Sequence, residues 1–376
     1  MPAPESSALL GGLTPAAFLR RHWQKRALLV RQAIPGFTGC VTRSALFALA
    51  ERDDVEARIV LRERNRWTTL EGPFSRSVQK NLPARGWTLL VHGVNLHAPP
   101  ADALLRRFAF IPYARLDDLM VSYAAPGGGV GPHFDSYDVF LLQGEGRRRW
   151  RISRQRDLEL KPRMPLKILA HFRPVVAWTL APGDMLYLPP DHAHDGVALD
   201  ACTTYSIGFR AASAQDLGNA FLDWLRDGLA LDGRYADPQL RVAREPARID
   251  ARMQDACAAM LRKIRWSDAD VARFLGSYLS EPKPQVVFTR PERPMPLGAF
   301  SRGAAKRGVS LNARTQILYD GRNVYVNGMA MAWPAGAQVA ISRLANARRL
   351  RGADVSGSVL IGLLHDWYCD GYLDLD

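Results

Sequence analysis

Cysteine is scarce in this sequence, and no two cysteines lie close together. The four of them, Cys40, Cys202, Cys257 and Cys369, form no Cys-x-x-Cys pair. This spacing argues against a zinc ribbon, a thioredoxin-like redox site and a disulfide framework. It suits a protein that works in a reducing cytosol.

Long apolar runs are lacking as well. No uninterrupted apolar stretch approaches the roughly 20 residues that a membrane-spanning helix needs. The first ten residues, MPAPESSALL, show no positive stretch followed by a long apolar run, so no secretory signal is indicated. We therefore expect a cytoplasmic protein that does not associate with a membrane.

Acidic residues are in deficit, since 50 Lys and Arg face 37 Asp and Glu and the formal net charge is +13. Such an excess raises the question of nucleic-acid binding. Residues 211–283 hold 11 basic and 11 acidic side chains, and residues 284–376 hold 11 and 7, so most of the excess lies in residues 1–210. Because the positive charge is not concentrated on a tail or a single helix, sequence-specific nucleic-acid binding is not expected. The charge would still suit a protein that acts on an RNA-rich assembly.

The chain is long enough for more than one domain, and its hydrophobic pattern changes along its length. Up to about residue 210, short apolar runs such as RIVLRE, WTLLVHGV and TTYSIGFR are separated by Gly and Pro. Many short strands with turn signals predict an antiparallel sandwich or barrel. A helix is expected before them, because Thr14 is a good N-cap and Pro15 suits the first helical position.

From Ser213 the pattern becomes helical. Leu217, Phe221, Leu225 and Leu229 recur every four residues, as on one face of a helix. Three amphipathic helices joined by short loops are expected within residues 211–283, and they could form either a self-contained bundle or a dimerisation element.

The last segment, residues 284–376, combines a hairpin and two helices. The run RTQILYDGRNVYVNG predicts two strands around an Asp320-Gly321 turn. Helices are expected in AGAQVAISRLANARRL and GSVLIGLLHDWYCDGYL. This order is typical of a winged-helix-like unit, and such units bind protein as well as DNA, so the fold alone does not decide its role.

A candidate metal centre comes from two separate stretches. His133 and Asp135 are two residues apart and would point to the same face of a strand. His194 comes from the second stretch. Two imidazoles and one carboxylate form a facial triad, which leaves three positions of an octahedral Fe(II) open for a chelating co-substrate and O2.

The surroundings of these residues resemble the two cupin sequence motifs. Gly127 precedes His133 by six positions, and Gly183-Asp184 and Pro189 precede His194. One departure is Asp191, where the cupin pattern usually has Gly.

A second histidine competes for the third ligand position. His192 would share a face with His194 on an extended strand, but the motif spacing favours His194. The other histidines are expected to be surface or packing residues; they are His22, His92, His97, His171 and His365.

A basic run near the centre predicts one buried arginine. In RRRWRIS, Arg147, Arg149 and Arg151 share one face of a strand, whereas Arg148 shares the other with Trp150 and Ile152. A charge on an apolar face needs an anionic partner. The distal carboxylate of 2-oxoglutarate would suit a guanidinium in bidentate geometry, and an ion pair with a protein carboxylate is the alternative.

With these residues assembled, the sequence resembles the JmjC-containing ribosomal oxygenases, and most of all the bacterial branch that hydroxylates an arginine of a large-subunit ribosomal protein. The resemblance is carried by FLRRHWQKRALLVRQAIPGF, PGGGVGPHFDSYDVFLLQGEGRRRWRIS and GDMLYLPPDHAHDG. It covers the whole chain. It implies a mainly β catalytic domain over residues 1–210 with the double-stranded β-helix of JmjC and cupin proteins, a helical dimerisation region over 211–283 and a winged-helix unit over 284–376.

The resemblance also implies a site and a reaction. The chain would be a homodimeric protein hydroxylase that uses Fe(II), 2-oxoglutarate and O2. Iron would be held by His133, Asp135 and His194, and 2-oxoglutarate by Arg148, with Ser122 as a second contact. Asp118 would pair with the substrate guanidinium, between Met120 and Tyr137 as walls, with Ser206 as a weaker addition.

Other functions remain open at this point. An N-methyl demethylase would use the same machinery. A cupin that senses a metabolite and is coupled to a DNA-binding winged helix is a second possibility, and a catalytically inactive scaffold is a third. A basic ribosomal protein is also an unexpected substrate for an enzyme with a net charge of +13, unless acidity around Asp118 outweighs that charge or ribosomal RNA assists recruitment.

Overall fold

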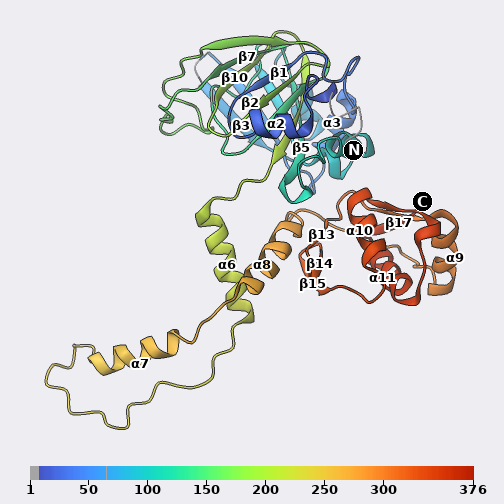
Figure 1. Cartoon of the computed structure of the whole chain (residues 1–376). Coiled ribbons are helices and arrows are strands. Elements are labelled where there is room, and N and C mark those ends of the chain that lie inside the picture. Colours follow the sequence, from blue (N-terminus) through green and yellow to red (C-terminus); the bar gives the residue numbers. More distant parts are fainter. Residues whose placement is uncertain (1–7, 65) are drawn as a thin grey trace.

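The structure is a computed structural model that describes residues 8–64 and 66–376. Most of the segment inspected for a secretory signal, residues 1–7, lies outside the described residues. Figure 1 shows three parts: a β-rich N-terminal unit, a group of helices that extends from it, and a compact C-terminal unit. No helix in the described ranges is long and apolar enough to cross a membrane.

The N-terminal unit is built from two antiparallel sheets, as the alternating runs predict. The large sheet contains, in spatial order, β1 (Leu28–Val30), β9 (Met185–Leu188), β6 (Val139–Gln143), β11 (Cys202–Phe209), β5 (Leu116–Ala124), β4 (Trp87–Val91), β2 (Ala57–Glu63) and β3 (Arg66–Glu71). The small sheet contains β10 (Ala193–Ala198), β7 (Arg148–Ser153) and β8 (Val176–Leu180). Together they form the double-stranded β-helix that the sequence indicated.

Strand β5 shows how the large sheet separates core from site. Leu119, Val121 and Tyr123 belong to the main hydrophobic core. The alternate residues point to the opposite face, because side chains alternate along a strand. On that face Ser122 meets Arg148 of the small sheet, so the second face of β5 lines the space between the two sheets.

Short helices surround the large sheet. They are α2 (Pro15–Arg21), α3 (Arg43–Leu49), α4 (Arg76–Lys80) and α5 (Pro99–Arg106), with 3-10 turns η1 (Val94–Leu96) and η2 (Tyr113–Arg115). Helix α2 begins as predicted, since the Thr14 side chain accepts a hydrogen bond from the Ala17 N–H. Its Phe18 is fully buried and packs on Phe140 and Tyr187 of the sheet.

The central segment holds α6 (Ala214–Gly228), α7 (Ala251–Leu261) and α8 (Asp268–Ser280). Helices α6 and α8 pack against each other through Phe221 and Phe274, whose ring centroids lie 5.2 Å apart. The expectation of short loops is wrong for one connection, because residues 229–250 form a long link without helix or strand. Figure 1 shows α7 at the end of this link, away from the other helices.

The C-terminal unit has its own hydrophobic core. It contains α9 (Leu297–Arg307), β12 (Val309–Leu311), β13 (Ile317–Tyr319), β14 (Asn323–Val326), β15 (Met329–Ala332), α10 (Gln338–Ala347), β16 (Arg349–Leu350), η3 (Gly352–Asp354), α11 (Ser358–Cys369) and β17 (Leu373–Leu375). The predicted hairpin is present, since β13 pairs with β14 across the Asp320-Gly321 turn. Helix α8 packs on this hairpin, where Gly276 leaves room for the Tyr325 ring.

Several polar contacts join the C-terminal unit and α8 to the N-terminal unit. The Tyr113 hydroxyl donates to the Asn346 carbonyl at 3.1 Å, and Arg314 Nη2 lies 3.3 Å from His97 Nδ1. Arg210, which follows β11, donates to the Leu279 carbonyl in the last turn of α8 at 2.7 Å. These bonds place the linker after α8 against the N-terminal unit.

Candidate active site

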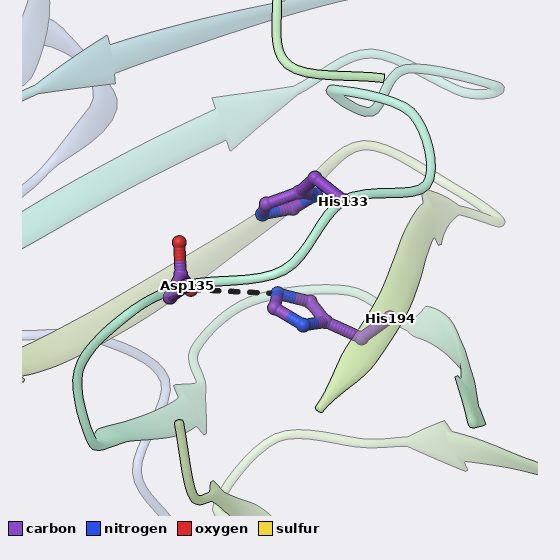
Figure 2. A group of neighbouring side chains, drawn as sticks. All are labelled: His133, Asp135 and His194. Atoms are coloured by element: carbon purple, nitrogen blue, oxygen red, sulfur yellow. Dashed lines mark ion pairs between the residues drawn. The ribbon is translucent and has the colours of Figure 1, made fainter. Parts of the chain in front are cut away.

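A short stretch of strand-like pairing brings the two candidate histidines together. The backbones of His133 and His194 form an isolated antiparallel bridge, with N–H to carbonyl distances of 2.9 and 2.7 Å. Their rings consequently lie side by side, with centroids 4.2 Å apart. Figure 2 shows both rings and the Asp135 carboxylate converging on one point.

The hydrogen bonds of the two rings define which nitrogen faces that point. His133 Nδ1 lies 2.9 Å from the Gly131 carbonyl, and His194 Nδ1 lies 2.8 Å from the His192 carbonyl. A carbonyl only accepts, so each Nδ1 carries the proton and each Nε2 keeps a free lone pair. Orientation of a ligating imidazole by such a backbone bond is typical of protein metal sites.

The carboxylate completes the group. Asp135 Oδ2 is 3.6 Å from His194 Nε2, and one ligand atom from each of His133, Asp135 and His194 lies within 4.8 Å of the others. Two imidazole nitrogens and one carboxylate oxygen are a donor set that suits Fe(II) with open coordination positions. The residues present therefore fit the metal that the sequence indicated.

Burial keeps one of these ligands in the form that binds metal. His194 is only 3% exposed. Burial, and secondarily the charge of His133, lower the pKa of His194 to about 4. At neutral pH its imidazole is therefore uncharged and able to donate a lone pair.

The route by which His133 and Asp135 come to face the same point differs from the expectation. They do not lie on a regular strand, because residues 134–138 form a bend between β5 and β6. The Asp191 N–H instead holds the Asp135 carbonyl at 2.8 Å. Asp191 has a φ of 58°, so it adopts the left-handed conformation for which the cupin pattern uses Gly, and which Asp tolerates better than most residues.

The glycine run before His133 is required by close backbone approach. A Cβ on Gly128 would lie 2.1 Å from the Trp87 carbonyl oxygen, and one on Gly129 would lie 2.5 Å from that of Gly196. No side chain fits at either position. The glycine run thus passes between β4 and β10, and this path places His133 beside His194.

The structure places the two rival histidines in different surroundings. The metal-ligand group contains His194 and not His192. His192 Nδ1 instead faces the Pro190 carbonyl at 3.2 Å, and its Nε2 is buried without a hydrogen-bond partner. A second group of side chains with metal-ligand chemistry lies exposed on the loop between β7 and β8; its members are Asp157, Glu159 and His171.

Arg148 is placed as the alternation of its strand predicts. Its side chain is buried, with 4% exposed, and so are Trp150 and Ile152 on the same face of the strand. Arg149, on the other face, is exposed. Its Nη2 donates to the Ser122 hydroxyl at 3.4 Å, and its Nε is buried without a partner. No carboxylate among residues 8–64 and 66–376 lies within 4.0 Å of its guanidinium, so the alternative of a protein ion pair does not hold.

The candidate substrate residues lie along the inner face of β5 and its neighbours. Met120 and Ser206 are directly opposite each other in the β5–β11 pair. Asp118 is 6% exposed, and its Oδ2 accepts a hydrogen bond from the Gly93 N–H at 2.8 Å. Tyr137 is 40% exposed as a whole, yet burial of its hydroxyl, and then the charges of Asp135 and Asp118, raise its pKa. The charges of both Asp135 and Asp118 thus act on the Tyr137 hydroxyl.

Two residues beside Asp118 were not found from the sequence. His92 Nδ1 and Lys283 Nζ each lie 3.7 Å from Asp118 Oδ2. His92 was expected to be a surface or packing residue, and Lys283 lies in the linker after α8. Neither stands in a motif, and only the fold brings them to β5.

A jelly roll with a His-Asp-His centre between its sheets defines the JmjC class of the cupin fold, and residues 103–217 match the family model of the JmjC domain. Residues 263–374 match the model of the ROXA-like winged helix, which includes α8.

The chain belongs to the ribosomal oxygenase family. It is 34% identical to the ribosomal protein uL16 3-hydroxylase of Escherichia coli strain K12 over 317 residues, which cover 83% of each chain. It is 37% identical to a probable ribosomal oxygenase of Haemophilus influenzae over 235 residues, 61% of this chain and 56% of that one. The E. coli ribosomal oxygenase YcfD, solved in complex with cobalt and 2-oxoglutarate, has a TM-score of 0.81 at 30% identity, covering 96% of this chain and 98% of YcfD.

Proposed function

We propose that this protein is an Fe(II)- and 2-oxoglutarate-dependent hydroxylase that uses O2 to oxidise an arginine side chain of a large-subunit ribosomal protein. The observation that carries the proposal is the buried Arg148 guanidinium, which has no carboxylate partner among the described residues and whose Nε is unsatisfied, together with the His133, Asp135 and His194 group. Membership of the ribosomal oxygenase family supports the same chemistry. A ribosomal substrate would place the enzyme in the cytoplasm, as the sequence led us to expect.

Each group of the site then has a part in the reaction. The two Nε2 lone pairs and the Asp135 carboxylate would hold Fe(II). Arg148, with the Ser122 hydroxyl, would bind the distal carboxylate of 2-oxoglutarate. Together the metal and co-substrate supply the oxidising power: one oxygen of O2 enters a substrate C–H bond, and the other converts 2-oxoglutarate to succinate and CO2. The protein itself positions the reactants and keeps water away from them.

The test of the proposal is succinate formation by the Fe(II)-loaded protein with 2-oxoglutarate and a panel of ribosomal-protein peptides, followed by mass spectrometry. A gain of one oxygen on an arginine of one peptide supports it. Loss of a methyl group with release of formaldehyde would instead identify a demethylase. Binding of a DNA duplex at physiological salt without any turnover would favour the metabolite-sensing alternative.

Asp118 is the proposed partner of the substrate guanidinium. Its Oδ2 is held by Gly93, and its Oδ1 has no hydrogen-bond partner within the described part of the chain, so this oxygen is available to a ligand. We expect Asp118→Asn to raise the KM for the peptide by about 30-fold or more, since removing one member of a buried charge pair costs about 2–5 kcal/mol. The KM for 2-oxoglutarate should not change. Equal effects on both constants would place Asp118 outside the substrate pocket.

We also propose that the protein is a homodimer and that α6, α7 and the link between them form the interface. Neither helix buries a residue in the single chain. Large apolar side chains are exposed along this segment; among them are Leu222, Leu240, Val242, Ile249 and Leu261. An exposed apolar surface of this kind marks a contact with another chain.

The proposed dimer can be tested by introducing charged residues into its interface. We expect Leu222→Glu together with Leu261→Glu to halve the mass measured by light scattering, because two carboxylates would be buried without partners. Val175→Glu is the matched control, since Val175 is an exposed apolar residue of the N-terminal unit and its replacement should leave the mass unchanged. A wild-type protein that elutes as a monomer would contradict the proposal.

A further inference from the structure

The linker after α8 reaches the candidate substrate pocket with one charged side chain. Lys283 Nζ lies 3.3 Å from Asp117 Oδ1 and 3.7 Å from Asp118 Oδ2. Pro282 and Pro284 flank Lys283 and restrict its backbone to an extended form. The Lys283 carbonyl also accepts a hydrogen bond from the Val286 N–H at 2.9 Å. The backbone that carries this side chain is therefore constrained.

The contact between Lys283 and Asp118 is electrostatic. Its 3.7 Å distance exceeds hydrogen-bond length, and the Gly93 N–H already holds the same oxygen at 2.8 Å. Lys283 thus adds little to the orientation of the carboxylate. It does add a positive charge next to the group that would receive a positive side chain.

The charges around Asp118 nearly balance. Asp117 and Asp118 face Lys283, and Arg210 Nε lies 3.6 Å from Asp117 Oδ1. His92 adds to the positive side when protonated. Burial would by itself lower the pKa of Lys283, but the charges of Asp118 and Asp117 raise it, so the ammonium form is retained. The acidity that could have attracted a basic substrate is therefore largely neutralised within the protein.

We propose that Lys283 is a specificity-determining residue: by partly cancelling the charge of Asp117 and Asp118, it weakens the affinity of the pocket for any cationic side chain. Binding then depends on the apolar and backbone contacts around the target residue, which distinguish one arginine from many in a basic ribosomal protein. The inference rests on the proposed function, because it takes Asp118 as the receiver of the substrate cation. The Lys283 ammonium group is brought to Asp118 by the linker after α8, which is held against the N-terminal unit by the bond from Arg210 to the Leu279 carbonyl.

The test is Lys283→Met, assayed with the arginine peptide at low ionic strength and again at about 1 M salt, where the Debye length is about 3 Å. We expect the KM for the peptide to fall roughly three- to tenfold at low salt with kcat unchanged, a modest range because the Lys283 side chain is 31% exposed. The gain should shrink at high salt. The dissociation constant of the peptide for the metal-free protein, measured by fluorescence anisotropy, should fall in parallel.

Three further variants make the test specific. Lys283→Arg keeps the charge and should match the wild type. Lys306→Met removes an exposed lysine of α9 and should change nothing, which excludes an effect of net charge. Asp117→Asn removes a negative charge from the same pocket and should raise the KM. An unchanged or raised KM in Lys283→Met would overturn the inference, whereas a wild type that oxidises no peptide would overturn the proposed function instead.

Discussion

His194→Ala is expected to abolish metal binding and to reduce succinate formation by more than about a hundredfold. Loss of an outer-shell partner alone typically costs 10- to 100-fold in metal affinity or activity, and a direct ligand should cost more. The remaining pair, His133 and Asp135, would leave a third position unfilled. The measurement is metal content after dialysis against Fe(II) or Mn(II), together with turnover of 2-oxoglutarate.

His192→Ala is the matched control for this variant. The two histidines lie two residues apart, and both are at least partly buried, but His192 stands outside the metal-ligand group. We expect His192→Ala to keep its metal and most of its turnover. The reverse pattern, with activity lost in His192→Ala and kept in His194→Ala, would show that the wrong histidine has been assigned to the metal.

Arg148→Met is expected to raise the KM for 2-oxoglutarate by roughly 30-fold to several thousandfold. That range corresponds to the 2–5 kcal/mol that a buried hydrogen-bonded charge pair loses when one partner is removed. The thermal stability of the free protein should not fall, because Arg148 has no carboxylate partner in the part of the chain that the structure describes, and its Nε is unsatisfied there. Keeping an unpaired charge out of water is costly, and an apolar side chain of similar length removes that cost.

The neighbouring residue provides a control for Arg148→Met on the same strand. Arg149 points to the opposite face and is exposed, so Arg149→Met removes the same charge without reaching the site. Its KM for 2-oxoglutarate should equal that of the wild type. If both variants raise this KM equally, the effect comes from the charge of the strand as a whole and Arg148 has no individual role in binding the co-substrate.

The prediction for Arg148 came from the sequence alone because strand geometry is local. Side chains alternate along a strand whatever the rest of the fold does, so the burial of Arg148 beside Trp150 and Ile152 could be stated in advance. The N-cap at Thr14 and the turn at Asp320-Gly321 are local in the same sense, and both are present in the structure. The long link between α6 and α7 was missed, since the amphipathic pattern says where a helix can form and not how far it continues.

The group of His133, Asp135 and His194 was predicted from the sequence, but the reason for its geometry was not. His133 and Asp135 do not share the face of a strand; they meet His194 through a backbone bridge and a bend held by Asp191. Residue types and spacing were sufficient to propose these three residues as ligands. The coordinates agree with the preference for His194 over His192 that the motif spacing gave, because only the His194 ring lies in the group with His133 and Asp135.

The sequence by itself determined the class of fold, the His-Asp-His group and the burial of Arg148, since all of these follow from short-range pattern and motif spacing. Only the tertiary structure decided the surroundings of Asp118. Its neighbours His92 and Lys283 come from distant parts of the chain, and no local signal links them. Charge acts through space and not along the sequence, so the balance of charge in the substrate pocket exists only once the linker after α8 has been placed against β5.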